Sequence, residues 1–184
     1  MRIVNKEECG IYQKDLFEQI SNGALFVHPT DTVYGWGCDA TNSQAVSKLR
    51  DAKECSQRPL PIIAPNKDWI KMNCEVTQEH LDMLPGPVML ITRLKNSSAL
   101  ASNVTNNDSI GVRLPDHWVS DFASKLGKPI VTTCVNKKGE EYVTAHDTMS
   151  PELKSKTAFF MNAGEIKGNR SRIINTIEET TTNR

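Results

Sequence analysis

The sequence predicts an α/β fold in which at least some of the strands run parallel. Segments rich in apolar and β-branched residues alternate along the chain with segments whose apolar residues recur at helical spacing. Prolines and glycines separate the two kinds of segment. The 184 residues suit one domain, which we expect at residues 1–177, followed by a polar tail at residues 178–184.

The first half of the chain is expected to alternate helices with two short strands. The expected elements are a helix at residues 12–20, a strand at 24–27, a helix at 42–52, a strand at 60–64 and a helix at 67–72. Asn22-Gly23 ends the first helix. The Thr41-Asn42-Ser43 run can cap the second helix, and Ala45 and Leu49 belong to its apolar face.

The second half of the chain is expected to be richer in strands. The expected elements are strands at residues 88–94, 109–114, 130–135, 158–161 and 172–177, with a helix that ends at residue 126. Pro85-Gly86-Pro87 forms a strong turn before the first of these strands. Asp116 is expected to cap the helix, which Gly127 and Pro129 end.

Composition excludes several classes of protein. Lysine and arginine total 22, as do aspartate and glutamate, so no overall field attracts nucleic acid or acidic membranes. No stretch approaches the roughly 20 apolar residues that span a bilayer, and the N-terminus is too charged for a signal peptide. The five cysteines are scattered without a CxxC pair, which indicates reduced thiols. We therefore expect a cytoplasmic protein that does not contact membranes.

Residues 27–40 contain the most informative pattern in the chain. Pro29 removes a backbone donor just after an apolar run, so the preceding strand cannot simply continue. Two hydroxyls and a carboxylate follow at residues 30–32, where they could hold a small polar ligand. Gly35 and Gly37 permit close approaches that a Cβ would prevent. The pattern predicts a loop that builds a binding site.

Five motifs in this order resemble the YrdC family, the threonylcarbamoyl-AMP synthases, over residues 10–176. They are residues 28–35 (HPTDTVYG), the basic run 53–58 with Pro59-Leu60, residues 84–88 (LPGPV), residues 109–117 (SIGVRLPDH) and residues 127–139 (GKPIVTTCVNKKG). The resemblance implies a twisted, open mixed sheet with flanking helices and a concave face that binds ligands.

The resemblance also implies a reaction. Family members condense L-threonine, bicarbonate and ATP into threonylcarbamoyl-adenylate and release pyrophosphate. A partner transferase then moves the threonylcarbamoyl group to the adenosine beside the anticodon of tRNA. Mg²⁺ would accompany ATP, held mainly by phosphates and water, so no protein metal site is expected. The mechanism needs no protein nucleophile.

The expected threonine-binding residues centre on an arginine. Arg113 lies on an expected strand between two apolar residues, and its planar guanidinium suits a carboxylate. Its alternative role is a structural ion pair with Asp116 or another carboxylate. The resemblance assigns the threonine site to Thr30, Thr32, Arg113 and Thr132. Thr132 and Thr133 could equally be ordinary strand residues.

The expected nucleotide-binding residues begin with cations that follow a helix. Lys53 and Arg58, with Arg50 one turn earlier, could surround a triphosphate, although cations also favour a helix C-terminus without any ligand. The nucleotide site that the resemblance implies consists of Lys53, Arg58, Ser109, Cys134, Asn136 and Ser171.

Two departures from the family pattern leave other functions open. Cys55 stands where the family usually has arginine, and Cys134 replaces the serine of a serine-alanine-asparagine motif. One alternative is a relative without activity that binds tRNA or double-stranded RNA. Its basic residues would be Lys137, Lys138, Lys167, Arg170 and Arg172. Another alternative is the carbamoyl-adenylate chemistry of hydrogenase-maturation carbamoyltransferases.

Overall fold

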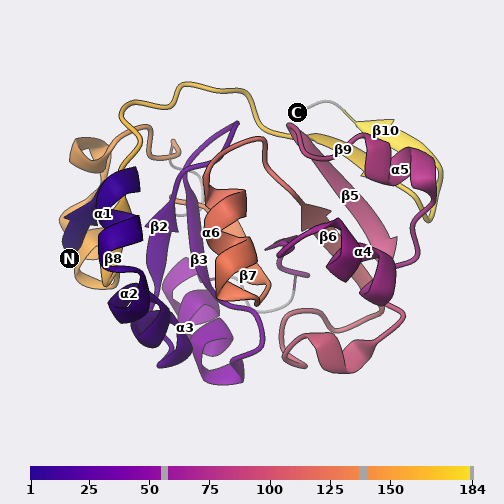
Figure 1. The fold of residues 1–184 in the computed structure, drawn as a ribbon, viewed down its shortest axis with the longest axis horizontal. Helices are drawn as coiled ribbons and strands as arrows, with labels where there is room; N and C mark the ends of the chain where they lie inside the picture. Colours follow the sequence, from indigo (N-terminus) through magenta and orange to yellow (C-terminus); the bar gives the residue numbers. More distant parts are fainter. Residues whose placement is uncertain (55–57, 137–140, 183–184) are drawn as a thin grey trace.

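A computed structural model describes residues 1–54, 58–136 and 141–182, and its strands form one mixed sheet (Figure 1). The strands lie side by side in the order β1-β8-β2-β3-β7-β4-β6-β5-β9-β10. Their bounds are β1 Arg2–Val4, β2 Phe26–His28, β3 Gly35–Asp39, β4 Ile62–Ile63, β5 Val88–Arg93, β6 Ser109–Arg113, β7 Ile130–Cys134, β8 Phe159–Met161, β9 Arg172–Asn175 and β10 Thr180–Thr182.

The sheet contains both parallel and antiparallel pairs, which confirms the predicted α/β class. The pairs β1–β8, β2–β8, β4–β6 and β5–β9 are parallel. The pairs β2–β3, β3–β7, β4–β7, β5–β6 and β9–β10 are antiparallel. The twisted mixed sheet with flanking helices is therefore the fold that the sequence predicted.

The helices cover both faces of the sheet. Their bounds are α1 Lys6–Ile11, α2 Gln13–Ser21, α3 Ser43–Lys53, α4 Lys67–Asn73, α5 Gln78–Asp82, α6 Val119–Leu126 and α7 Pro151–Ser155. Helices α1, α2 and α6 pack on the face that carries Phe26 and Ile130. Helix α3 packs with α4, α5 and α7 in a second core, which contains Val27 and Trp36 from the opposite face.

Strand β3 is the largest difference from the expected elements. We expected a loop as far as residue 40, but residues 35–39 form a fully buried strand between β2 and β7. Glycine is rare in strands, and here it allows close packing. A Cβ at Gly37 would lie 2.6 Å from the carbonyl oxygen of Val131 on β7. The absence of a side chain at Gly37 therefore allows β3 to pack closely against the Val131 backbone and the Ile130 side chain of β7.

Smaller differences concern the ends of elements. Asp116 does not cap α6, because the helix begins only at Val119, with Trp118 at the N-cap position and no side-chain cap. The Asp116 backbone N–H donates to Asp31. Residues 180–182, expected in a polar tail, form β10 and pair with β9. Strand β1 and helices α1, α5 and α7 were also not expected, since each is shorter than two helical turns or four strand residues. For α1, the capping box of Asn5 and Glu8 was the available signal.

The C-terminus of α3 provides a test of local strain. Glu54 occupies its C-cap with φ 52°, a left-handed conformation in which glycine carries no Cβ penalty. We expect Glu54→Gly to raise the free energy of unfolding by about 0.5–1 kcal/mol, measured by urea denaturation. Glu54→Ala is the matched control, because it removes the carboxylate but keeps the strain. Equal stability of the two variants would contradict the backbone explanation.

Candidate functional site

A cavity of about 500 Å³ opens where the loop after β2 meets strands β5, β6 and β7. Every residue that we expected to bind threonine or nucleotide lines it, with the exception of Asn136. The residues from those sets are Thr30, Thr32, Lys53, Arg58, Ser109, Arg113, Thr132, Cys134 and Ser171. The structure thus gathers positions from five separate parts of the chain, although their roles stay predictions.

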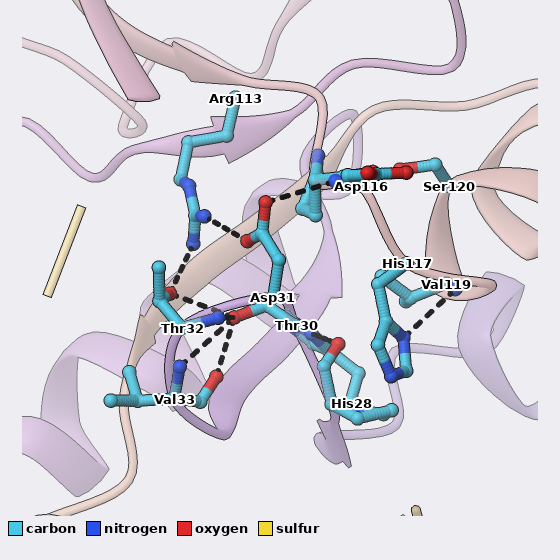
Figure 2. A network of polar contacts seen from close by, with 12 residues as sticks. His28, Thr30, Asp31, Thr32, Val33, Arg113, Asp116, His117, Val119 and Ser120 are labelled. Atoms are coloured by element: carbon cyan, nitrogen blue, oxygen red, sulfur yellow. Dashed lines mark hydrogen bonds and ion pairs between the residues drawn. The ribbon is translucent and has the colours of Figure 1, made fainter. Parts of the chain in front are cut away.

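The loop after β2 owes its shape to the hydroxyl of Thr30 (Figure 2). This hydroxyl donates to the carbonyl of Val33 at 2.6 Å and accepts the backbone N–H groups of Thr32 and Val33, each at 3.1 Å. Short local bonds of this kind are typical of threonine in turns. The Thr30 side chain therefore holds the loop in place at the edge of the cavity.

Arg113 forms a buried ion pair with Asp31 across the loop (Figure 2). Its Nη2 lies 2.6 Å from Asp31 Oδ1, and its Nη1 donates to the Thr32 hydroxyl at 3.1 Å. The second Asp31 oxygen accepts the backbone N–H of Asp116 at 2.9 Å. The structural ion pair that we considered thus exists, but its carboxylate comes from Asp31 and not from Asp116.

The Arg113 guanidinium still has capacity for a further acceptor. Its Nε is buried and has no hydrogen-bond partner among the residues that the structure describes. Burial lowers the pKa of Arg113 while Asp31 raises it, and an arginine remains charged at neutral pH under either influence. A positively charged group therefore lies at the cavity wall, oriented by Asp31.

Lys53 connects α3 to the end of β7. Its Nζ donates to the carbonyls of Cys134 and Asn136 at 2.9 and 2.6 Å, and to the Asn136 side-chain oxygen at 2.8 Å. These contacts explain why Asn136 stays outside the cavity. Lys53 binds the backbone carbonyl of Cys134 and not its side chain, so a cysteine in place of the family's serine does not remove this contact. Cys55 lies outside the described residues.

Arg50, which we considered a phosphate ligand, has a different position. Its guanidinium donates to the carbonyls of Arg58, Asn103 and Val104 at 2.8–3.0 Å. The side chain is not among those that line the cavity. Arg50 therefore connects α3 to the loop around Val104. It does not lie at the cavity, where we expected a nucleotide ligand.

Arg170 lines the cavity, although we had not included it among the expected threonine-binding or nucleotide-binding residues. It reaches the cavity because the segment between β8 and β9, residues 162–171, crosses the loop after β2. Gly168 packs so closely there that a Cβ would overlap the carbonyl oxygen of Thr32. The Tyr34 hydroxyl also donates to the carbonyl of Gly164 at 2.7 Å. The available sequence signal was the resemblance of residues 168–173 to the family's C-terminal nucleotide-side segment.

The cavity is strongly asymmetric in charge and polarity. Four cationic side chains line it, those of Lys53, Arg58, Arg113 and Arg170, whereas no Asp or Glu does so among the described residues. Apolar groups form another part of the wall, including Pro61, Met89 and Ile91. Such a lining suits a ligand that combines negative charge with an apolar portion.

His28 lies beneath this cavity and is fully buried. Burial is the main cause that lowers its pKa to about 4, and the charges of Arg113 and His117 lower it further. The ring is therefore neutral at pH 7, with its Nδ1 3.3 Å from the carbonyl oxygen of Pro29.

The buried His28 predicts a loss of stability in mild acid. The unfolded chain takes up a proton near pH 6.5, whereas the folded chain resists until about pH 4. Stability is therefore complete above pH 6.5 and falls as the pH drops toward 4, by about 3 kcal/mol. Urea denaturation across this range measures it, with His28→Phe as the comparison. An equally steep fall in the variant would contradict this assignment.

Comparisons with known proteins agree with this architecture. The Sua5/YciO/YrdC family model, described as "Telomere recombination", matches residues 18–183. A threonylcarbamoyl-AMP synthase of Vibrio campbellii is 30% identical over 169 residues, which cover 83% of this chain and 88% of that protein. The family model and this relative thus both match most of the chain.

Solved structures share the fold. The structure of P. abyssi Sua5 complexed with L-threonine matches with a TM-score of 0.84 at 23% identity, covering 98% of this chain. The chain spans about half of that protein, 55% of its length. E. coli YciO matches with a TM-score of 0.83 at 14% identity, covering 99% of this chain and 92% of YciO. The chain belongs to the Sua5/YciO/YrdC family.

The described residues contain neither a membrane-spanning helix nor a cluster of metal-binding side chains. Within residues 1–54, 58–136 and 141–182, no helix has the length and apolar character required to cross a membrane. In the same part of the chain, no group of three His, Cys, Asp or Glu side chains could hold a metal ion.

Proposed function

We propose that this protein synthesises L-threonylcarbamoyl-adenylate from L-threonine, bicarbonate and ATP, for the modification of tRNA by a partner transferase. The supporting observation is the cavity, which combines the residues expected for both substrates with four cationic side chains. Relatives named threonylcarbamoyl-AMP synthase support the same class of reaction. The cavity volume of about 500 Å³ lies within the range of small-molecule sites.

The reaction consists of two steps that this cavity could serve. The amino group of threonine first loses its extra proton, then adds to the carbon of bicarbonate, and water leaves as the carbamate forms. A carbamate oxygen then attacks the α-phosphorus of ATP, and the bond to the β-phosphate oxygen breaks to release pyrophosphate. Holding three substrates in one cavity gives the main advantage in rate, because each encounter becomes intramolecular.

Each charged group has a defined task in this proposal. Arg113, oriented by Asp31, binds the carboxylate of threonine with the capacity left on its guanidinium. Arg58 and Arg170 stabilise the charge that moves toward the departing pyrophosphate. Lys53 adds its charge while it fixes the end of β7. Mg²⁺ would arrive with ATP, bound by phosphates and water.

The RNA-binding alternative receives less support from the described residues. Lys167 pairs with Glu165 at 2.9 Å, and Arg170 faces the cavity while lying 5.7 Å from the Tyr142 ring. Lys137 and Lys138 lie outside the described residues. A chain with a formal net charge of zero would also need these groups concentrated on one face.

Pyrophosphate release tests the proposal. The protein is incubated with ATP, Mg²⁺ and bicarbonate, with and without L-threonine, and the adenylate is sought by mass spectrometry. Release that depends on threonine, together with the adenylate, is the expected result. D-Threonine is the matched control substrate. Folded protein that releases no pyrophosphate, yet binds RNA with a steep salt dependence, would favour the alternative.

A further inference from the structure

His28 and the cavity residue Thr132 share one face of the sheet. In the register of the strands, His28 on β2 faces Gly35 on β3, and Gly37 on β3 faces Thr132 on β7. Opposed residues point to the same face, as do residues two positions apart on one strand. The two glycines of β3 therefore leave a side-chain-free strip between His28 and Thr132.

The imidazole of His28 fills this strip. A Cβ built on Gly35 would overlap the imidazole and would lie 2.7 Å from both His28 Nε2 and the Thr132 hydroxyl oxygen. These two polar atoms are therefore separated by no more than twice that distance. His28 reaches across β3 to the underside of a residue that lines the cavity.

The hydrogen bonding of His28 defines what its Nε2 can do. The nearest partner of Nδ1 is the Pro29 carbonyl at 3.3 Å, and a carbonyl only accepts, so Nδ1 carries the hydrogen. Nε2 is then a bare acceptor. It is buried and has no hydrogen-bond partner in the described structure. Buried polar atoms without partners are rare in proteins, so this atom beside a cavity residue calls for an explanation.

We propose that His28 is a positioning residue that orients the Thr132 hydroxyl toward the amino group of a bound amino acid. When the cavity is occupied, the Thr132 hydroxyl donates its single hydrogen to His28 Nε2. Its oxygen then has only lone pairs to offer on the cavity side, and these accept an N–H of the substrate. The inference rests on the proposed function and adds a positioning residue for the amino group of its substrate, L-threonine.

At a second position in the cavity, Arg113 supplies hydrogen-bond donors, whereas Thr132 supplies an acceptor. Its guanidinium can only donate, so it favours the carboxylate of the same substrate. A donor at Arg113 and an acceptor at Thr132 together define the direction in which an amino acid binds. In this proposal the sheet, through His28 and Thr132, positions the amino group that must attack bicarbonate.

If His28 only fills space in the core, its substitution should affect all ligands alike. Calorimetry with L-threonine and (R)-3-hydroxybutyrate, which lacks the amino group, separates the two explanations. We expect His28→Phe to weaken L-threonine about tenfold and to leave (R)-3-hydroxybutyrate and ATP unchanged. In a Thr132→Val background, His28→Phe should cause no further loss, because the two residues act as one unit. Equal loss for both ligands, or additive losses, would overturn the inference.

A measurement on the unaltered protein avoids any effect of substitution on folding. With ¹⁵N-labelled histidine, the ring nitrogens of His28 should show the Nδ1–H tautomer. Addition of L-threonine should shift the Nε2 resonance toward that of a hydrogen-bonded nitrogen. Saturation with L-threonine without this shift would overturn the role of His28 alone. Absence of L-threonine binding would instead overturn the proposed function and this inference with it.

Discussion

Arg113→Ala is expected to abolish pyrophosphate release that depends on L-threonine and to lower the free energy of unfolding by about 3–5 kcal/mol. The side chains of Arg113 and Asp31 are only 7% and 10% exposed, so the substitution leaves a buried carboxylate without its partner. Urea denaturation measures the loss of stability, and calorimetry measures the loss of L-threonine binding. ATP should bind with nearly unchanged affinity, because Arg58 and Arg170 remain.

A double variant separates the two consequences of this substitution. Arg113→Met with Asp31→Asn removes both charges together, so most of the stability should return. L-Threonine binding should not return, since no cation remains for its carboxylate. Recovery of binding in the double variant would show that Arg113 only supports the loop after β2. Equal loss of ATP and L-threonine would carry the same meaning.

Gly37→Ala is expected to lower the free energy of unfolding by about 3 kcal/mol. The new Cβ would lie 2.6 Å from the backbone carbonyl of Val131 and 3.0 Å from the side chain of Ile130. That carbonyl belongs to the central strand β7, which cannot move without disturbing β3 and β4 on either side. Urea denaturation measures the effect, with L-threonine binding as a second measurement.

Gly10→Ala provides the matched control for this substitution. Gly10 lies in α1, where a new Cβ would meet no atom within 4 Å. Alanine is favoured over glycine inside a helix, so this variant should gain about 0.5–1 kcal/mol. If Gly37→Ala were as stable as the unaltered protein, the close packing of β3 against β7 would not constrain the sheet.

The parts of the fold that the sequence predicted are those with a strong local pattern. Strands β5 and β6 consist of β-branched and apolar runs, and α3 has both a cap and an apolar face. Strand β3 has neither signal, because its two glycines serve contacts with His28 and β7 that exist only in the folded sheet. Local pattern could not distinguish these glycines from those of a loop.

In the candidate site, sequence motifs again predicted some features, whereas contacts between distant residues could not be predicted. The cavity residues were found because their motifs are short and distinctive. The partners of these residues were not, because Asp31 and Arg113 are 82 positions apart and Lys53 binds backbone carbonyls that no sequence pattern marks. Arg170 was not among the predicted site residues, since only the crossing of residues 162–171 over Thr32 brings it to the cavity.

The crossing of residues 162–171 has a consequence for how the protein is made. The cavity draws Thr30 from near one end of the chain and Ser171 from near the other. During synthesis the ribosome therefore releases most of the sheet before the cavity can close. The nascent chain gains its ligands late, so substrate cannot stabilise early folding steps. Those steps depend on contacts among strands made earlier, such as the pairing of β3 with β2 and β7 and of β6 with β4 and β5.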